Sequence, residues 1–223
     1  MRTLVIAPHP DDEVLGCGGT LLRKKAEGGE LGWLIVTGMS ESDGWSPERI
    51  QMRDSEIARV PSVIGFDRVY NLGLPTTKLD TIAMSDIVRR FSETFVDFEP
   101  DEVLVPHHGD VHSDYEVVFD AAAACVKWFR YPFVTRVLAY ETLSETDLAL
   151  DPSRVFRPTV FVDISDFLEK KLEVMKVYES EMGGFPFPRS AEALRALATV
   201  RGAAAGFSAT EAFELLRERV GSP

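Results

Sequence analysis

Residues 4–26 read LVIAPHPDDEVLGCGGTLLRKKA, in which an apolar run, a dense polar turn and a helical pattern follow one another. The apolar run at 4–7 has the length of a buried strand, and Pro8 ends it. The helical pattern begins at about Val14 and is closed by a pair of glycines at 28–29. A buried strand that leads directly into a helix predicts the first unit of a parallel α/β sheet.

The same alternation of strand and helix continues along the chain. Further buried strands are expected at about residues 33–37, 69–72, 103–106, 136–140 and 160–164. Further helices are expected at about residues 47–59, 82–98, 116–129, 166–180, 191–205 and 210–220. This alternation predicts a mostly parallel sheet with helices on both faces and a helical C-terminal segment. Because no repeat or flexible linker divides the chain, we expect a single domain over residues 1–223.

The composition limits the partners of the chain. Its 223 residues are 45% hydrophobic and 27% charged, which is typical of a globular protein, and the formal net charge is −12. So acidic a surface disfavours nucleic acid and anionic membranes as partners. No apolar stretch has the length of a membrane span, and the apolar start is too short for a signal peptide, so we expect a cytoplasmic protein. Cys17 and Cys125 are expected to be buried free thiols.

Two polar segments are expected to meet at one edge of the sheet. Ligands of α/β sheets bind beyond the carboxyl ends of the strands, where residues 9–13 and 107–115 are predicted to lie. The first segment crowds one histidine and three acids into a turn, which is costly without a compensating cation. His9 and Asp12, three positions apart, could converge on one zinc ion and leave Asp11 beside it as a base. A helix-capping turn is the alternative, but it explains single residues better than the set.

The acidic turn also resembles a known family signature. Residues 8–13, PHPDDE, continuing through LGCGG at 15–19, are similar to the first motif of the PIG-L/LmbE-like de-N-acetylases. Over roughly the first 130 residues, the resemblance extends to Arg53 and Glu56, to NLGLP at 71–75 and to DVHSDY at 110–115. It implies a zinc-dependent enzyme with a Rossmann-like core. Such enzymes deacetylate N-acetylglucosamine units on lipids, thiol precursors or antibiotic intermediates.

The resemblance implies roles for individual residues. His9 and Asp12 fall on metal ligands. Asp11 falls on the general base, and His112 on the histidine that assists as electrophile or acid. Tyr115 stands where the family has a histidine as third metal ligand. Three outcomes are open: Tyr115 binds as phenolate, His112 becomes the third ligand, or the site holds metal weakly. We favour His112, because a phenol with a pKa of about 10 is a poor zinc ligand.

These residues predict a metal-dependent hydrolase, and the resemblance implies that it removes an N-acyl group, foremost N-acetyl, from a small-molecule amino-sugar substrate. Zn2+ or another divalent metal would activate water, Asp11 would take its proton, and His112 would support the carbonyl oxygen. Because of Tyr115, the alternative is a catalytically impaired sugar-binding protein on the same fold. A phosphoesterase would need more basic residues near the site, and a nucleotide-binding oxidoreductase would need glycines in the first turn.

The loop that carries His112 contains four further polar residues. His107 and His108 are expected to be a packed or hydrogen-bonded loop pair. Asp110 and Asp114 are expected to orient His112 or to cap the next helix.

Three weaker signals lie elsewhere in the chain. Arg53 could balance the acidic turn, and Trp45 could stack on a sugar ring. Residues 183–189, GGFPFPR, form an apolar loop that could close the pocket or pack against another subunit in a homo-oligomer.

Overall fold

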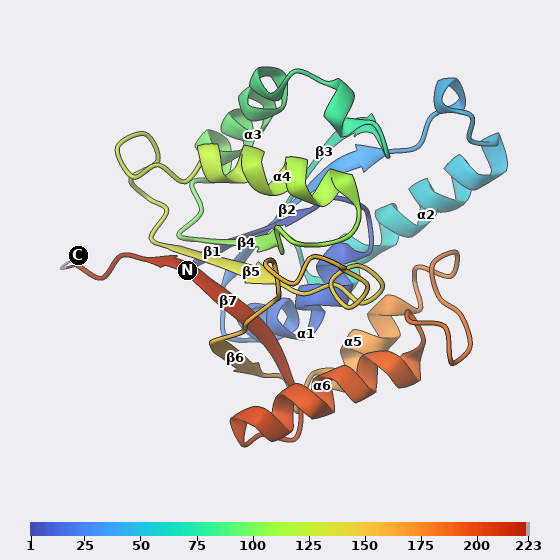
Figure 1. Cartoon of the computed structure of the whole chain (residues 1–223), viewed down its shortest axis with the longest axis vertical. Coiled ribbons are helices and arrows are strands. Elements are labelled where there is room, and N and C mark those ends of the chain that lie inside the picture. Colours follow the sequence, from blue (N-terminus) through green and yellow to red (C-terminus); the bar gives the residue numbers. More distant parts are fainter. Residues whose placement is uncertain (222–223) are drawn as a thin grey trace.

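The computed structural model describes residues 1–221. Its centre is a seven-stranded sheet with the order β3-β2-β1-β4-β5-β7-β6 (Figure 1). The strands are β1 (Arg2–Ala7), β2 (Glu30–Gly38), β3 (Arg68–Pro75), β4 (Glu102–Pro106), β5 (Arg136–Tyr140), β6 (Val160–Asp163) and β7 (Thr210–Glu218). Strands β1 to β5 pair in parallel, whereas β7 is antiparallel to β5 and β6. The predicted α/β fold is confirmed, and the order 3-2-1-4-5 is that of a Rossmann-like sheet.

Helices cover both faces of this sheet. One face carries α1 (Asp12–Ala26), α2 (Pro47–Ile64), α5 (Leu168–Met175) and α6 (Ala191–Ala205). The other carries α3 (Met84–Phe98) and α4 (Ser113–Ala124), and two short 3-10 turns are η1 (Glu41–Asp43) and η2 (Leu79–Thr81). In Figure 1, α3 and α4 lie above the sheet, and α1, α5 and α6 lie below it. The sheet is therefore buried between two apolar cores.

Consecutive side chains of β1 point into these two cores in turn. Val5 and Ala7 belong to the core on the α1 side, whereas Leu4 and Ile6 belong to the core on the α3 side. All four side chains are fully buried. A strand with both faces covered needs apolar residues at every position, which explains the continuous run in the sequence.

The start of α2 follows the predicted capping pattern. Ser46 Oγ accepts a hydrogen bond from the backbone N–H of Arg49 at 3.3 Å, and Pro47 is the first helical residue. The helix continues past the predicted end at residue 59 to Ile64. It ends at Gly65, whose φ of 92° lies in the left-handed region that favours glycine.

The prediction of a helix at residues 210–220 is wrong, because this segment forms β7. Its sequence, TEAFELLRE, favours a helix locally, but β7 pairs with β5 on one side and β6 on the other. Glu211 is buried there, where it accepts a hydrogen bond from Nζ of Lys171 at 2.7 Å and from two N–H groups of α1. The C-terminal segment is therefore helical through α5 and α6 but closes with a strand.

The state of the cysteines and the length of the helices can both be compared with the sequence. Cys17 and Cys125 are buried free thiols, as predicted. Within residues 1–221, no helix is both long enough and apolar enough to cross a membrane.

Candidate metal and catalytic site

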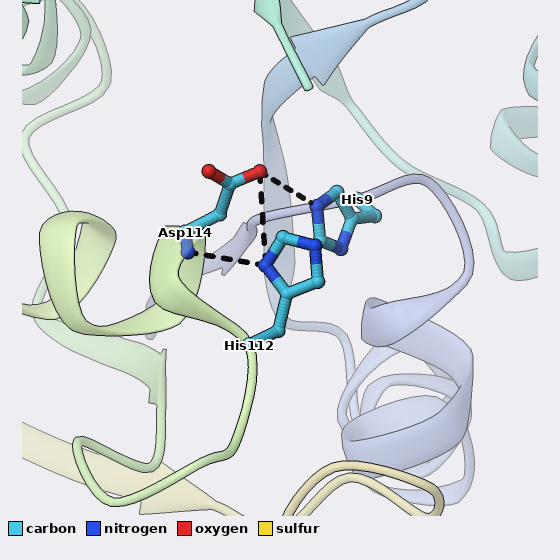
Figure 2. Close-up of side chains that lie close together, drawn as sticks. All are labelled: His9, His112 and Asp114. Atoms are coloured by element: carbon cyan, nitrogen blue, oxygen red, sulfur yellow. Dashed lines mark hydrogen bonds and ion pairs between the residues drawn. The ribbon is translucent and has the colours of Figure 1, made fainter. Parts of the chain in front are cut away.

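The two polar segments meet at the carboxyl edge of the sheet, as predicted. Because β1 and β4 are neighbouring parallel strands, the segments that follow them leave the sheet side by side. Nε2 of His9, after β1, lies 3.0 Å from Oδ2 of Asp114, in the first turn of α4 (Figure 2). The ring centroids of His9 and His112 are 4.7 Å apart, in an edge-to-face arrangement.

His9, His112 and Asp114 form a group that could hold a metal ion. One ligand atom from each side chain lies within 4.8 Å of the other two. Two imidazole nitrogens and a carboxylate oxygen are a donor set that zinc accepts. Asp12 stands beside this group, with its Oδ2 3.7 Å from Nδ1 of His9. The predicted ligands His9, Asp12 and His112 are thus neighbours, but their role as ligands stays a prediction.

Asp114 is held by several hydrogen bonds. Its Oδ2 lies next to Nε2 of His9 and also accepts a hydrogen bond from the backbone N–H of Thr77 at 2.8 Å. Its Oδ1 accepts a hydrogen bond from the backbone N–H of Leu79 at 3.4 Å. Burial acts to raise the pKa of Asp114, but the hydrogen bonds from His9 and Thr77 bring it below its ordinary value. Asp114 is therefore an ionised group that orients His9, whereas the sequence pointed to His112 or a helix cap.

His112 is the N-cap residue of α4. Its Nδ1 accepts a hydrogen bond from the backbone N–H of Asp114 at 3.1 Å, which starts the helix at Ser113 rather than at the predicted 116. Burial and the nearby His9 lower the pKa of His112, so its imidazole is neutral at pH 7. With Nδ1 engaged by the helix, Nε2 is the nitrogen available for a metal or a substrate.

Tyr115 points at the acidic turn from α4. Its fully buried hydroxyl donates a hydrogen bond to Oδ1 of Asp12 at 2.5 Å. The other oxygen of Asp12 accepts from the backbone N–H of His9 at 2.8 Å. Burial, together with the charge of Asp12, raises the pKa of Tyr115 well above its ordinary value. In this arrangement Tyr115 is a neutral donor that orients Asp12.

The backbone of Asp11 adopts a rare conformation. Its φ of 124° lies in the left-handed region, and its N–H donates to Oε2 of Glu13 at 3.1 Å. Glu13 is in turn fixed by the hydroxyl of Tyr178, which donates to Oε1 at 2.6 Å. Burial raises the pKa of Asp11 to about 6, although the positive charge of Arg189 opposes the rise. A carboxylate with this pKa is ionised at neutral pH and is suited to accept a proton.

Two arginines approach the acidic turn from different parts of the chain. Arg53 of α2 donates to the backbone oxygen of Pro10 at 3.1 Å and pairs with Glu181. Arg189, in the loop before α6, donates from Nη1 to Oδ2 of Asp11 at 2.8 Å. The sequence singled out Arg53 to balance the acids and missed this role of Arg189, because a pairing across 178 positions leaves no local pattern.

A cavity of about 180 Å³ opens beside these groups. Its walls include His9, Asp11, Trp45, His112, Glu145 and Arg189. Trp45 thus lines the cavity, and its stacking on a sugar ring stays a prediction.

The remaining polar residues of the loop after β4 lie outside the group of His9, His112 and Asp114. Nε2 of His107 is 2.9 Å from the backbone oxygen of Arg154, which is the packed arrangement expected for it. Asp110 accepts a hydrogen bond from the hydroxyl of Thr146 at 2.6 Å. Within the described residues its buried Oδ2 has no hydrogen-bond partner, and burial raises the pKa of Asp110 to about 8. Neither residue orients His112.

Relatives of known activity match most of the chain. It is 26% identical over 197 residues to diacetylchitobiose deacetylase of Thermococcus kodakarensis, which covers 81% of this chain and 70% of that protein. It is 29% identical over 212 residues to 2'-N-acetylparomamine deacetylase of Streptomyces fradiae, with 81% and 73% covered.

Solved structures share the fold over nearly the full length. A conserved protein of Thermus thermophilus superimposes with a TM-score of 0.77 and 28% identity, covering 99% of this chain and 97% of the other. The N,N'-diacetylchitobiose deacetylase of Pyrococcus horikoshii has the same fold, with a TM-score of 0.74 and 22% identity over 97% and 84% of the two chains. Residues 4–126, which include both polar segments and more than half of the sequence, match the family described as GlcNAc-PI de-N-acetylase, PIG-L. The chain belongs to this PIG-L family.

Proposed function

We propose that the chain is a zinc-dependent hydrolase that removes an N-acetyl group from an amino-sugar substrate. The proposal rests on the surroundings of the His9 imidazole. Asp12 lies near its Nδ1 and Asp114 near its Nε2, and Asp11 lines the same cavity as His9. The two relatives named above are deacetylases of diacetylchitobiose and 2'-N-acetylparomamine, which are both amino sugars.

The distances around His9 suggest which side chains would hold the metal. Two zinc ligands at bond lengths of about 2.0–2.1 Å and a tetrahedral angle are about 3.4 Å apart. Nδ1 of His9 and Oδ2 of Asp12 are 3.7 Å apart, close to this separation. Nε2 of His9 and Oδ2 of Asp114 are 3.0 Å apart, which is a hydrogen bond. We therefore assign His9 and Asp12 as ligands and Asp114 as the carboxylate that orients the ligand histidine.

The third ligand is assigned to His112. It is neutral, as a metal-binding imidazole must be, and its Nε2 is not used by the helix cap. Tyr115 is assigned the role of a donor to Asp12, because burial and the Asp12 charge oppose loss of its proton.

The chemistry divides between the metal and the chain. A zinc ion held by His9, Asp12 and His112 would lower the pKa of the attacking water and polarise the amide carbonyl. Asp11 accepts the proton of the attacking water and returns it to the departing amine. The cavity walls hold the sugar, with Trp45 against one face of the ring. A neutral substrate, or a product that carries an ammonium group, suits the formal charge of −12.

Acetate release and zinc content test the proposal together. Purified wild type is incubated with N-acetylglucosamine, N,N'-diacetylchitobiose and 2'-N-acetylparomamine, and acetate and free amine are quantified. Asp12→Asn is expected to lose zinc. Asp114→Asn is expected to keep it with affinity lowered about 10- to 100-fold, because it alters only the orientation of His9. Asp86→Asn, an exposed acid of α3, serves as control.

Two results would contradict parts of this assignment. If Asp114→Asn loses zinc and Asp12→Asn keeps it, the ligands are His9, His112 and Asp114 instead. A zinc-loaded wild type that releases no acetate from any of the three sugars would contradict deacetylation.

A second function is favoured by one observation. Tyr115 occupies the position of the expected third ligand, and its hydroxyl donates a hydrogen bond to one oxygen of Asp12. A chain that binds an amino sugar without hydrolysing it would explain this arrangement. Sugar binding by calorimetry without acetate release, together with activity gained in Tyr115→His, would support this function over the first.

A further inference from the structure

We infer that Arg189 is a positioning residue that holds the carboxylate of Asp11 in the orientation that proton transfer requires. The inference rests on the proposed function. It concerns a residue of the C-terminal third, outside the family match at residues 4–126. The site would then be completed by a segment far from the acidic turn in sequence.

The turn itself fixes the backbone of Asp11 but not its side chain. The N–H of Asp11 donates to Glu13, and its carbonyl oxygen accepts from the N–H groups of Val14 and Leu15 at 2.9 Å. Among the described residues, the side chain that donates to its carboxylate is Arg189, with Nη1 2.8 Å from Oδ2. The direction of the carboxylate therefore depends on where Arg189 stands.

Arg189 is itself held on three sides. Its Nε donates to Oγ of Ser144 at 2.9 Å, and its Nη1 donates to Oε2 of Glu181 at 2.9 Å. Its Nη2 lies 3.4 Å from Oε1 of Glu145. A planar guanidinium with five donors in fixed directions can serve all these partners at once, which a lysine ammonium cannot do with the same geometry.

The loop that carries Arg189 is tied to the acidic turn and to α2. The hydroxyl of Tyr178 donates to Glu13, and Ser180 donates from both N–H and Oγ to Glu56 at 3.0 Å. In Figure 1 this loop, between α5 and α6, lies next to α2. These contacts fix the start of the loop, and none of them involves a side chain assigned as a metal ligand.

The expected effect of losing Arg189 follows from its contact with a reacting group. A displacement of about 1 Å of such a group lowers the rate about 100-fold. Arg189→Met, which keeps the bulk of the side chain, is therefore expected to lower kcat about 100-fold. Zinc content and KM are expected to stay within about threefold of wild type. Arg189→Lys is expected to recover about a tenth of the wild-type kcat.

A double-mutant cycle separates positioning from a merely structural role. If Arg189 acts through Asp11, adding Arg189→Met to Asp11→Asn changes kcat by less than about threefold. Arg195→Met is the matched control, because Arg195 lies on α6 and pairs with Glu169 in an exposed position. It is expected to keep wild-type kcat.

Three results would overturn the inference. The first is a kcat of Arg189→Met that stays within threefold of wild type. The second is a double variant in which the losses of kcat from Arg189→Met and Asp11→Asn add fully. The third is a loss of kcat that is explained by loss of zinc. If the zinc-loaded wild type has no deacetylase activity, the proposed function fails instead. A crystal structure of Arg189→Met then decides: a rotated Asp11 carboxylate supports the inference, and an unmoved one overturns it.

Discussion

Asp110 is the residue at which the structure makes the sharpest prediction about pH. The residue is 8% exposed. Its carboxyl group accepts one hydrogen bond from Thr146 and has, within the described residues, no partner for its buried second oxygen. A buried carboxylate with one oxygen unpaired is destabilised relative to its protonated form. Asp110→Asn keeps the shape of the side chain and removes its titration.

The magnitude follows from the two pKa values. Burial raises the pKa of Asp110 from its ordinary value of 3.8 to about 8 in the folded protein. Between these values the folded state binds one proton more than the unfolded state. The free energy of unfolding therefore falls as pH rises, by about 1.4 kcal/mol per unit. From pH 5 to pH 7 the loss due to Asp110 is about 3 kcal/mol.

Urea denaturation of both proteins at pH 5 and pH 7, in the presence of EDTA, measures this loss. Titration of other groups affects wild type and Asp110→Asn alike, so it cancels in the difference. The unfolding free energy of the variant minus that of wild type is expected to rise by about 3 kcal/mol between the two pH values. If this difference in unfolding free energy instead stays constant within about 0.5 kcal/mol, the pKa of Asp110 is not raised, because Asp110 is then ionised in the folded state at pH 5.

Two further predictions concern stability and metal binding. Lys171→Met leaves the buried carboxylate of Glu211 without its charged partner and should lower the unfolding free energy by about 3–5 kcal/mol, measured by urea denaturation. Lys170→Met, at an exposed neighbouring position, should change it by less than about 0.5 kcal/mol, and equal effects would contradict the role of the buried pair. Tyr115→Phe removes a donor to Asp12 but no ligand, so the variant should still bind zinc, with affinity lowered by about 10- to 100-fold at most, as measured by zinc titration and mass spectrometry. Loss of zinc as complete as that expected for Asp12→Asn would contradict the role of a donor and favour Tyr115 as a metal ligand.

The parts of the fold that the sequence predicted are those in which local pattern and packing agree. The run at 4–7 is apolar at every position because both faces of β1 are covered. Ser46 and Pro47 mark the start of α2 because a helix end needs a local acceptor for its free N–H groups. By contrast, β7 consists of residues that favour a helix, and only its place between β5 and β6 makes it a strand.

The candidate site was predictable to a similar extent. The acidic turn and His112 were found because their spacing is local and resembles a family motif. The contact of Asp114 with His9 spans 105 positions, and that of Arg189 with Asp11 spans 178. Such contacts depend on the strand order and on the course of the loop before α6, which no local pattern contains.

We propose that this chain holds a catalytic zinc ion, with His112 in place of the histidine that is the family's third metal ligand. Zinc content of purified wild type, His112→Ala and Tyr115→His, measured by mass spectrometry on the same preparations, tests it most directly. We expect about one zinc ion per chain in wild type and no zinc in His112→Ala. A wild type without zinc, in which Tyr115→His restores the metal, would show that the metal site has decayed. The chain would then be assigned to sugar binding instead of deacetylation.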